Sequence, residues 1–366
     1  MVRRMKRITA LDSVRGIAAL VVVLYHCSLV IPHLLDRLQA TYVLRPLVAG
    51  PEAVYIFFVL SGFVLYGVLS PESAPAYQSY AAKRVIRLWV PVAAAVVGSA
   101  FLYLIIQPSP VPGTGGWLAD ESWNEPLSLG NLAGHLALFG GDRFHQLDNP
   151  IWSLAHEVKI SLLFPVVVPL VARRPTAALL GATLVSVLAA MTTQPKWLSE
   201  SFDPARSLHY LFLFVAGAVI AARRGSLSAM ASSVRGKALT VPLLLSSILL
   251  LCSDEQVEVS IGAALFIGLC ATSDAVAKRL EHPILRWLGR ISYSLYLVHL
   301  VVLLAIVHTL GSVVPPPLLV ALVVPVSLGT AEIFCQMVEL PSIRLASRVA
   351  ANWGQKHRPA GLQVIG

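Results

Sequence analysis

The sequence is 366 residues long, and 56% of its residues are hydrophobic while only 13% are charged. A water-soluble protein carries roughly 25% charged residues because its surface must be hydrated, so the composition excludes an ordinary soluble enzyme. The formal net charge of +9 does not indicate nucleic-acid binding, since the basic residues lie in short segments that flank every second apolar run. We therefore expect an all-α membrane protein with no nucleic-acid partner.

Long apolar runs predict a polytopic bundle of about ten transmembrane helices. The runs are continuously apolar and do not alternate with polar residues, which favours helices over a β-barrel. Some are shorter than the roughly 20 residues that a spanning helix needs, so we expect their ends to extend into the flanking residues. The predicted spans are residues 14–31, 47–69, 85–106, 151–171, 177–191, 208–222, 239–251, 257–272, 291–310 and 318–338.

The first apolar run follows a basic N-terminal segment, as the apolar part of a signal peptide does. Arg15 and His26 interrupt this run, however, and no small-x-small cleavage site follows it promptly. We therefore interpret it as the first transmembrane helix. The four cysteines all fall in apolar runs without paired spacing, which indicates buried thiols and neither disulfides nor a metal site.

The basic residues between the spans predict the orientation of the chain. Lysine and arginine are frequent before the first and third spans, after the fourth, between the sixth and seventh, between the eighth and ninth, and after the tenth. With ten spans all of these segments lie on one side, which the positive-inside rule assigns to the cytoplasm. We expect both chain ends there, in a multi-pass protein of the cell membrane.

One predicted external connector, residues 107–150, is much longer than the others and is rich in glycine and proline. A loop of this length without obvious secondary structure is usually functional or disordered. Within it, residues 127–139 predict a short helix at the membrane interface.

Two ionisable residues of the first span share one helix face. Arg15 and His26 are eleven residues apart, which at 100° per residue brings them within about 20° of the same direction and separates them by about 16 Å along the axis. An ionisable side chain in hydrocarbon is costly and indicates a functional site by default. His26 could instead be a buried histidine bonded to a neighbouring helix, and Asp12 could either pair with Arg15 or cap the helix.

The third and fourth spans carry further charges. Arg84 and Arg87, at positions i and i+3, point the same way and could clamp a phosphorylated ligand, although they could also serve only to orient the helix. Glu157 lies one to two turns from the predicted external end of the fourth span, and we expect it to face the interior of the bundle. His156 and Lys159 lie beside it.

Six segments in chain order resemble the motifs of the acyltransferase-3 family of multi-pass membrane acyltransferases. Each motif alone is weak evidence, but the ordered set is specific and covers most of the chain. One departure is that many members continue after Glu157 with an aromatic pair, where this chain has Val158 and Lys159. The matching segments are residues 11–20 with His26, 57–63, 84–87 with Pro91, 152–157, 214–217 and 291–299.

The resemblance implies one acyltransferase-3 transmembrane domain over residues 1–345 and a cytoplasmic tail over residues 346–366. It also implies transfer of an acyl group, usually acetyl, from cytoplasmic acyl-CoA to a hydroxyl of a carbohydrate, a lipid-linked sugar or a small metabolite. Acyl-CoA would then be a substrate, and no bound cofactor or metal is expected. The implied catalytic residues are His26, Glu157 and Asp12, the implied acyl-CoA ligands are Arg15, Arg84 and Arg87, and the implied supporting residues are Ser61, Trp152, Ser153, His156, Tyr293 and His299.

A proton-coupled transporter or flippase is the alternative, because buried histidine and glutamate side chains also suit proton coupling. The absence of an evident inverted repeat argues mildly against it.

Overall fold

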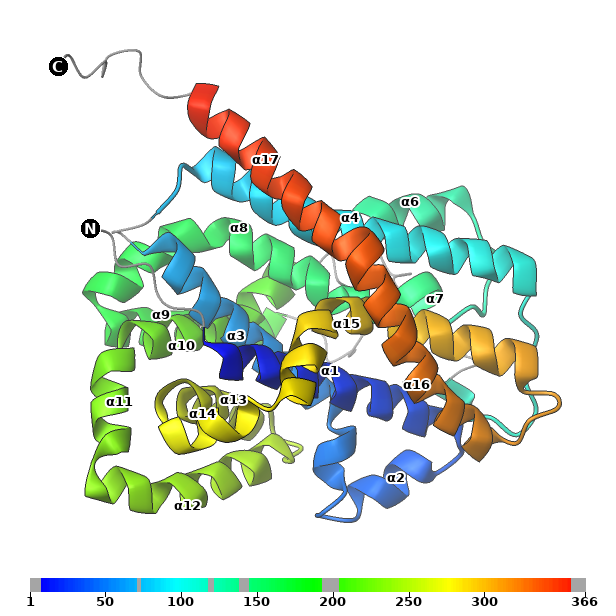
Figure 1. Cartoon of the computed structure of the whole chain (residues 1–366), viewed down its shortest axis with the longest axis horizontal. Helices are drawn as coiled ribbons and strands as arrows, with labels where there is room; N and C mark the ends of the chain where they lie inside the picture. Colours follow the sequence, from blue (N-terminus) through cyan, green and yellow to red (C-terminus); the bar gives the residue numbers. More distant parts are fainter. Residues whose placement is uncertain (1–7, 71–73, 118–121, 138–144, 193–203, 357–366) are drawn as a thin grey trace.

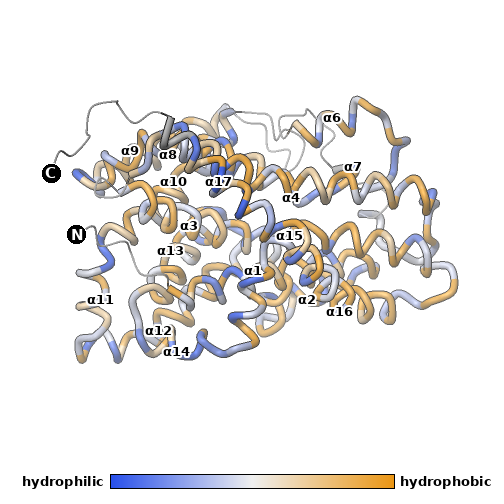
Figure 2. The backbone as a smooth tube through the Cα atoms, turned by 45° about the horizontal axis from the view of Figure 1, so that its top comes forward, coloured by the Kyte–Doolittle hydropathy of each residue, from blue (hydrophilic) through white to orange (hydrophobic). Residues whose placement is uncertain are grey.

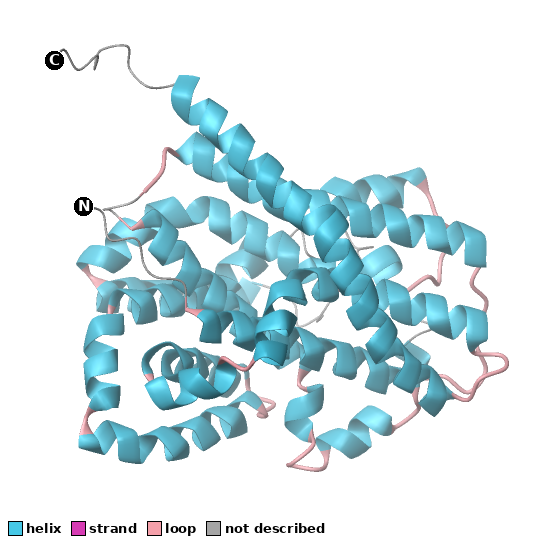
Figure 3. Ribbon diagram, viewed as in Figure 1, coloured by secondary structure: helices cyan, strands magenta, loops and turns pink. Residues whose placement is uncertain are grey.

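The computed structural model describes residues 8–70, 74–117, 122–137, 145–192 and 204–356. Throughout these described residues the regular secondary structure is helical (Figure 3). The first half of the chain forms α1 (Thr9–Val30), α2 (Leu34–Gln39), η1 (Arg45–Val48), α3 (Gly50–Leu69), α4 (Tyr77–Ile106), α6 (Leu129–Ala137), α7 (His145–Asp148), α8 (Ile151–Arg173) and α9 (Pro175–Thr192). The second half forms α10 (Pro204–Ala222), α11 (Arg224–Ser232), α12 (Val234–Leu251), α13 (Gln256–Thr272), α14 (Asp274–Leu280), α15 (Pro283–Leu310), α16 (Pro316–Phe334), the π-helix η2 (Cys335–Glu339) and α17 (Leu340–Lys356).

The predicted all-α polytopic bundle is confirmed. Nine helices in the described part of the chain are long and apolar enough to cross a membrane, and α13 with α14, bent by 90°, can form a tenth span. The helix ends extend beyond the apolar runs as expected, and α4 begins at Tyr77. Apolar residues occupy most of each long helix, while polar residues gather at helix ends and along α17 (Figure 2).

The packing of α1 on α15 supports ten crossings. Gly16 contacts Gly289 and His26 contacts His299, and both pairs are 273 positions apart, so the two helices run parallel. Parallel spanning helices cross in the same direction, which requires an odd number of crossings between them. The helices α3, α4, α8, α9, α10 and α12 supply six. Counting the bent pair α13–α14 as the seventh makes the number odd.

Glycines allow the central helices to touch through their backbones. A Cβ atom on Gly16 would lie 2.5 Å from the backbone nitrogen of Gly289, and one on Gly217 of α10 would lie 1.8 Å from the carbonyl oxygen of Val59 in α3. Small residues allow such close approach between membrane helices, where dispersion contacts replace the hydrophobic effect. The helix α15 lies at the centre, with 83% of its apolar stretch buried, whereas α12 at the edge has 11% buried.

The long connector between α4 and α8 folds back into the protein. Its predicted interfacial helix corresponds to α6, and Gln146 to Pro150 are all buried. The hydroxyl of Ser99 in α4 donates to the carbonyl of Leu147 at 2.6 Å. As a result, α8 begins within the protein interior and not at an external surface.

The last apolar run continues through η2 into α17, giving a single helical stretch from Pro316 to Asn352. The helix α17 lies along α4 (Figure 1), where the hydroxyl of Ser79 donates to the carbonyl of Ala350 at 2.9 Å. The predicted tail boundary at residue 345 thus falls inside a packed helix, while residues 357–366 lie outside the described residues.

The orientation of the bundle can be tested by labelling. In a cysteine-free background, we expect a cysteine at Val313, in the α15–α16 turn, to react with an impermeant thiol reagent added outside intact cells. A cysteine at Met230 in α11 should react only after permeabilisation, because the positive-inside rule places α11 in the cytoplasm. Both side chains are exposed, at 76% and 67%, so reaction of position 230 in intact cells would reverse the predicted orientation.

Candidate active site

His26 and His299 form a buried histidine pair at the contact between α1 and α15. The Nε2 atom of His299 lies 3.2 Å from the Nδ1 atom of His26, and the ring centroids are 5.0 Å apart. Both imidazoles are buried. The close backbone approach at Gly16 and Gly289, ten residues earlier in each helix, brings the two rings together.

Two backbone carbonyls define which ring nitrogens carry protons when both rings are neutral. The Nδ1 atom of His299 lies 3.0 Å from the carbonyl oxygen of Leu295, and the Nδ1 atom of His26 lies 2.9 Å from that of Val22. Because a carbonyl oxygen only accepts hydrogen bonds, each Nδ1 carries a hydrogen. Nε2 of His299 then accepts from His26, and Nε2 of His26 keeps its lone pair. A histidine in this tautomer can act as a base through Nε2.

The connector after α4 covers His26. The backbone N–H of Gly115 donates to the carbonyl of Val30 at 2.9 Å, and the ring of Trp117 lies 5.5 Å from the ring of His26, measured between centroids. A Cβ atom on Gly115 would lie 2.3 Å from the carbonyl oxygen of Leu29, so only glycine fits there. The indole therefore lies against the His26 ring on the side of the connector.

An ion pair joins the third and fourth long helices. The guanidinium of Arg84 donates to the carboxylate of Glu157 at 2.5 Å, and the hydroxyl of Ser61 in α3 donates to the same oxygen at 3.0 Å. The two charged side chains are only 13% and 16% exposed. Removing one charge would leave the other poorly solvated, which makes such pairs costly to break.

Further charges lie around this ion pair. Arg84, Arg15, Glu339 and Glu157 all lie within electrostatic range of Arg87. Glu339 is buried and accepts a hydrogen bond from Ser294 at 2.6 Å, whereas Arg87 is exposed. The hydroxyl of Tyr293 donates to the carbonyl of Leu88 at 2.8 Å. We call Arg15, Arg84, Arg87, Glu157 and Glu339 the arginine–glutamate cluster.

This cluster brings together residues that the sequence analysis placed apart. Glu157 was expected near the external face, away from Arg84 and Arg87, yet it pairs directly with Arg84. The expectation fails because α8 starts inside the protein, so that residues near its first turn already lie deep. Arg15 lies within electrostatic range of Arg87, and Ser61 and Tyr293 also contact the cluster or its helices.

Asp12 lies apart from the histidine pair. It is fourteen residues from His26 on the same helix, or about 21 Å along the axis. Helix α1 begins at Thr9, so Asp12 lies in its first turn and is not the N-cap residue. Its backbone packs against Gly289.

The predicted supporting residues of α8 form a separate polar contact. Ser153 lies 2.7 Å from the hydroxyl of Tyr296, and His156 bonds Ser207 of α10 at 2.8 Å. Trp152 packs near the rings of His156 and Tyr210, with centroid distances of 6.0 and 6.1 Å. These contacts hold α8 against α10 and α15.

Sequence reasoning did not single out Glu339, Ser294 or Trp117 as site residues. Glu339 ends the π-helix η2, and π-helical turns inside α-helices are frequent at functional sites. A glutamate directly after the tenth apolar run, residues 318–338, was a detectable signal for Glu339. The position of Trp117 depends on how the connector folds back, which the sequence pattern does not reveal.

Asp148 is the buried carboxylate nearest to the start of α8. Both of its oxygens are buried without a hydrogen-bond partner among the described residues. Burial raises the pKa of this carboxyl well above its usual range, because desolvation disfavours the charged form. Asp148 therefore stays protonated at pH values at which an exposed aspartate is ionised.

A family model described as an acyltransferase domain matches residues 8–334. The matched stretch runs from the start of α1 to the end of α16 and contains the histidine pair and all of the arginine–glutamate cluster except Glu339. No curated protein and no solved structure matches the chain at the required significance.

Asp148 predicts a pH-dependent stability. Its pKa in the folded protein is raised above the unfolded value, which is about 3.9. The stability that the protonated carboxyl contributes is therefore complete below that value and is lost as pH rises through the folded pKa. We expect thermal unfolding scans to show Asp148→Asn gaining stability relative to the unmodified protein as pH rises. Identical pH profiles of the two proteins would show that Asp148 does not titrate abnormally.

Proposed function

The chain belongs to the acyltransferase family whose domain model covers residues 8–334, and from this premise we propose which acyl transfer it catalyses. It is a membrane O-acyltransferase that takes an acyl group, acetyl in the simplest case, from cytoplasmic acyl-CoA. The acceptor is a hydroxyl of a carbohydrate, a glycolipid or a related metabolite. Family membership favours an enzyme over the alternative of a transporter.

The arrangement of α1 supports this proposal most directly. Arg15 lies in the arginine–glutamate cluster and His26 lies in the histidine pair, about 16 Å further along the same helix. Coenzyme A has the same order of groups, with phosphates at one end and a thioester at the end of an extended pantetheine arm. Phosphates held by the cluster would therefore leave the thioester within reach of His26.

The cluster suits a diphosphate. Arginine presents a planar fork of donors that matches phosphate geometry, and three arginines lie in the cluster. Glu157 pairs with Arg84. A bound phosphate would take hydrogen bonds from Arg84 that Glu157 accepts now. Without a phosphate, the carboxylates offset the repulsion among the three arginines.

The histidine pair suits proton transfer during ester formation. The Nε2 atom of His26 accepts the proton of the acceptor hydroxyl while the hydroxyl oxygen attacks the thioester carbonyl carbon. The carbon–sulfur bond breaks, and His26 returns the proton to the leaving thiolate. The products are the ester and free CoA, with no net release of a proton.

His299 acts as a positioning residue in this scheme. By accepting from Nδ1 of His26, it adds to the Val22 carbonyl in holding the tautomer in which Nε2 is the base, as an orienting partner does in other histidine-dependent sites. The ring of Trp117 beside His26 offers an apolar wall for the acceptor and limits access of water.

Replacing His26 tests the chemistry. General-base assistance is typically worth 10²- to 10⁴-fold, so purified His26→Ala in lipid should lose about that much acetyl-CoA turnover while still binding CoA. His299→Phe should lose less, because the Val22 carbonyl still holds the hydrogen on Nδ1 of His26. It should also change the pH profile of the remaining turnover, because the imidazole that shares this hydrogen is removed. A folded His26→Ala protein with near-normal turnover would disprove the catalytic role.

The ion pair predicts opposite effects of its two members on donor binding. Arg84→Ala should weaken CoA binding about tenfold, since a charge-assisted hydrogen bond contributes roughly 1.5–3 kcal/mol. Glu157→Gln should bind CoA at least as tightly as the unmodified protein, because it removes the carboxylate that competes for Arg84. Titration calorimetry on both variants in lipid would measure this, and equal weakening by both would indicate a purely structural pair.

A further inference from the structure

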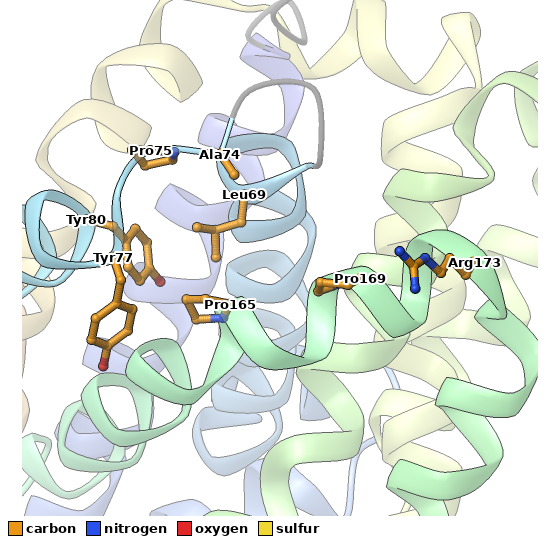
Figure 4. A pocket seen from close by; sticks show the side chains of 8 residues that line it. All are labelled: Leu69, Ala74, Pro75, Tyr77, Tyr80, Pro165, Pro169 and Arg173. Carbon is orange, nitrogen blue, oxygen red and sulfur yellow. The ribbon is translucent and has the colours of Figure 1, made fainter. Parts of the chain in front are cut away.

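A cavity of about 320 Å³ opens between the end of α3, the start of α4 and the second half of α8. In Figure 4, Tyr77 and Tyr80 lie at one end of the cavity and Arg173 at the other, with Pro165 and Pro169 of α8 between them. The lining is mostly apolar and includes one cation. Its shape therefore offers a flat aromatic surface and, separately, a positive charge.

The two tyrosines of α4 that line the cavity lie on the same face of this helix as the arginines of the arginine–glutamate cluster. At 100° per residue, Tyr77, Tyr80, Arg84 and Arg87 point within about 80° of one another. Tyr80 donates to the carbonyl of Ser161 at 2.7 Å, and Ser161 lies one turn along α8 from the residue that pairs with Arg84. Tyr80 also lies within electrostatic range of that ion pair.

The two prolines of α8 leave polar backbone atoms at this face. Proline has no amide hydrogen, so Pro165 and Pro169 cannot donate to the carbonyls four residues earlier. The carbonyl of Ser161 receives the hydroxyl of Tyr80 in compensation. The carbonyl of Pro165 has no amide donor from Pro169 and can accept a hydrogen bond from a ligand.

We propose that this cavity binds the adenosine 3′-phosphate end of the donor acyl-CoA. The adenine ring packs on Tyr77, and its amino group donates a hydrogen bond to the carbonyl of Pro165. The 3′-phosphate pairs with Arg173. This site rests on the proposed function and extends it, because it assigns the part of the donor that the arginine–glutamate cluster does not hold.

The order of the three sites matches the order of groups in the donor. The cavity lies at the N-terminal end of α4, the arginine–glutamate cluster follows about 6 Å further along the helix from Tyr80 to Arg84, and the histidine pair lies beyond the cluster along α1. Adenosine, diphosphate, pantetheine and thioester follow one another in the same sequence. A phospholipid headgroup would use Arg173 equally well, but it would give no role to the aromatic end of the cavity.

The test compares variants of the purified protein in lipid nanodiscs. Arg173→Ala and Tyr77→Ala should each weaken binding of CoA about tenfold. Arg173→Ala should in addition lose the preference for CoA over 3′-dephospho-CoA, and unmodified protein should bind adenosine 3′,5′-bisphosphate by itself. Arg174→Ala and Tyr42→Ala are the matched controls, since both residues are exposed and neither lines the cavity.

The outcomes separate this site from the proposed function. If Arg84→Ala loses CoA binding while Arg173→Ala and Tyr77→Ala keep normal affinity, the nucleotide end lies elsewhere and the proposed function stands. Loss of co-purified phospholipid from the two cavity variants, with unchanged CoA affinity, would make the cavity a lipid site and overturn the inference. Failure of the unmodified protein to bind CoA would overturn both proposals.

Discussion

The contact between the backbones of α1 and α15 determines where the other functional groups lie. Gly16 and Gly289 allow the two helices to approach until a single added Cβ would meet main-chain atoms. The helices then run parallel for three turns to His26 and His299. Without this approach the imidazoles would not meet, and Arg15 would not reach the charges of α4 and η2. Membrane helices gain packing energy in this way because lipid offers no hydrophobic driving force for association.

The interior charges impose a second constraint, because each must be neutralised where it lies. Arg84 and Glu157 satisfy one another with help from Ser61, and Ser294 bonds Glu339. These partners come from four helices and a π-helical turn, so the polar cluster also fixes how the helices are arranged around it. A ligand with several negative charges would enter a site that already holds cations in place, and it would not have to order them.

The sequence was sufficient to predict the helices and to identify many polar residues of the site. It was not sufficient to predict how deep in the bundle these residues lie. Apolar runs predict spans because backbone groups in hydrocarbon must bond within the helix, and the spacing of Arg15 and His26 follows from helical geometry. The predicted depth of Glu157 was wrong because it was counted from an assumed external surface. In the structure α8 starts behind the buried residues Gln146 to Pro150. Contacts such as Trp117 on His26 depend on tertiary folding of a connector, which leaves no periodic signal.

The segment that contains Gly115 and Trp117 gives the site a direction. It is bonded to the last turn of α1 through Gly115 and Val30 and lies over His26, while the arginines lie on the other side of the histidine pair along α1. On the proposed function, donor and acceptor would therefore meet at His26 from opposite compartments, and neither would have to traverse the bilayer. Only the acyl group would change sides. Group transfer would then be vectorial, with the direction determined by the side from which each substrate reaches His26.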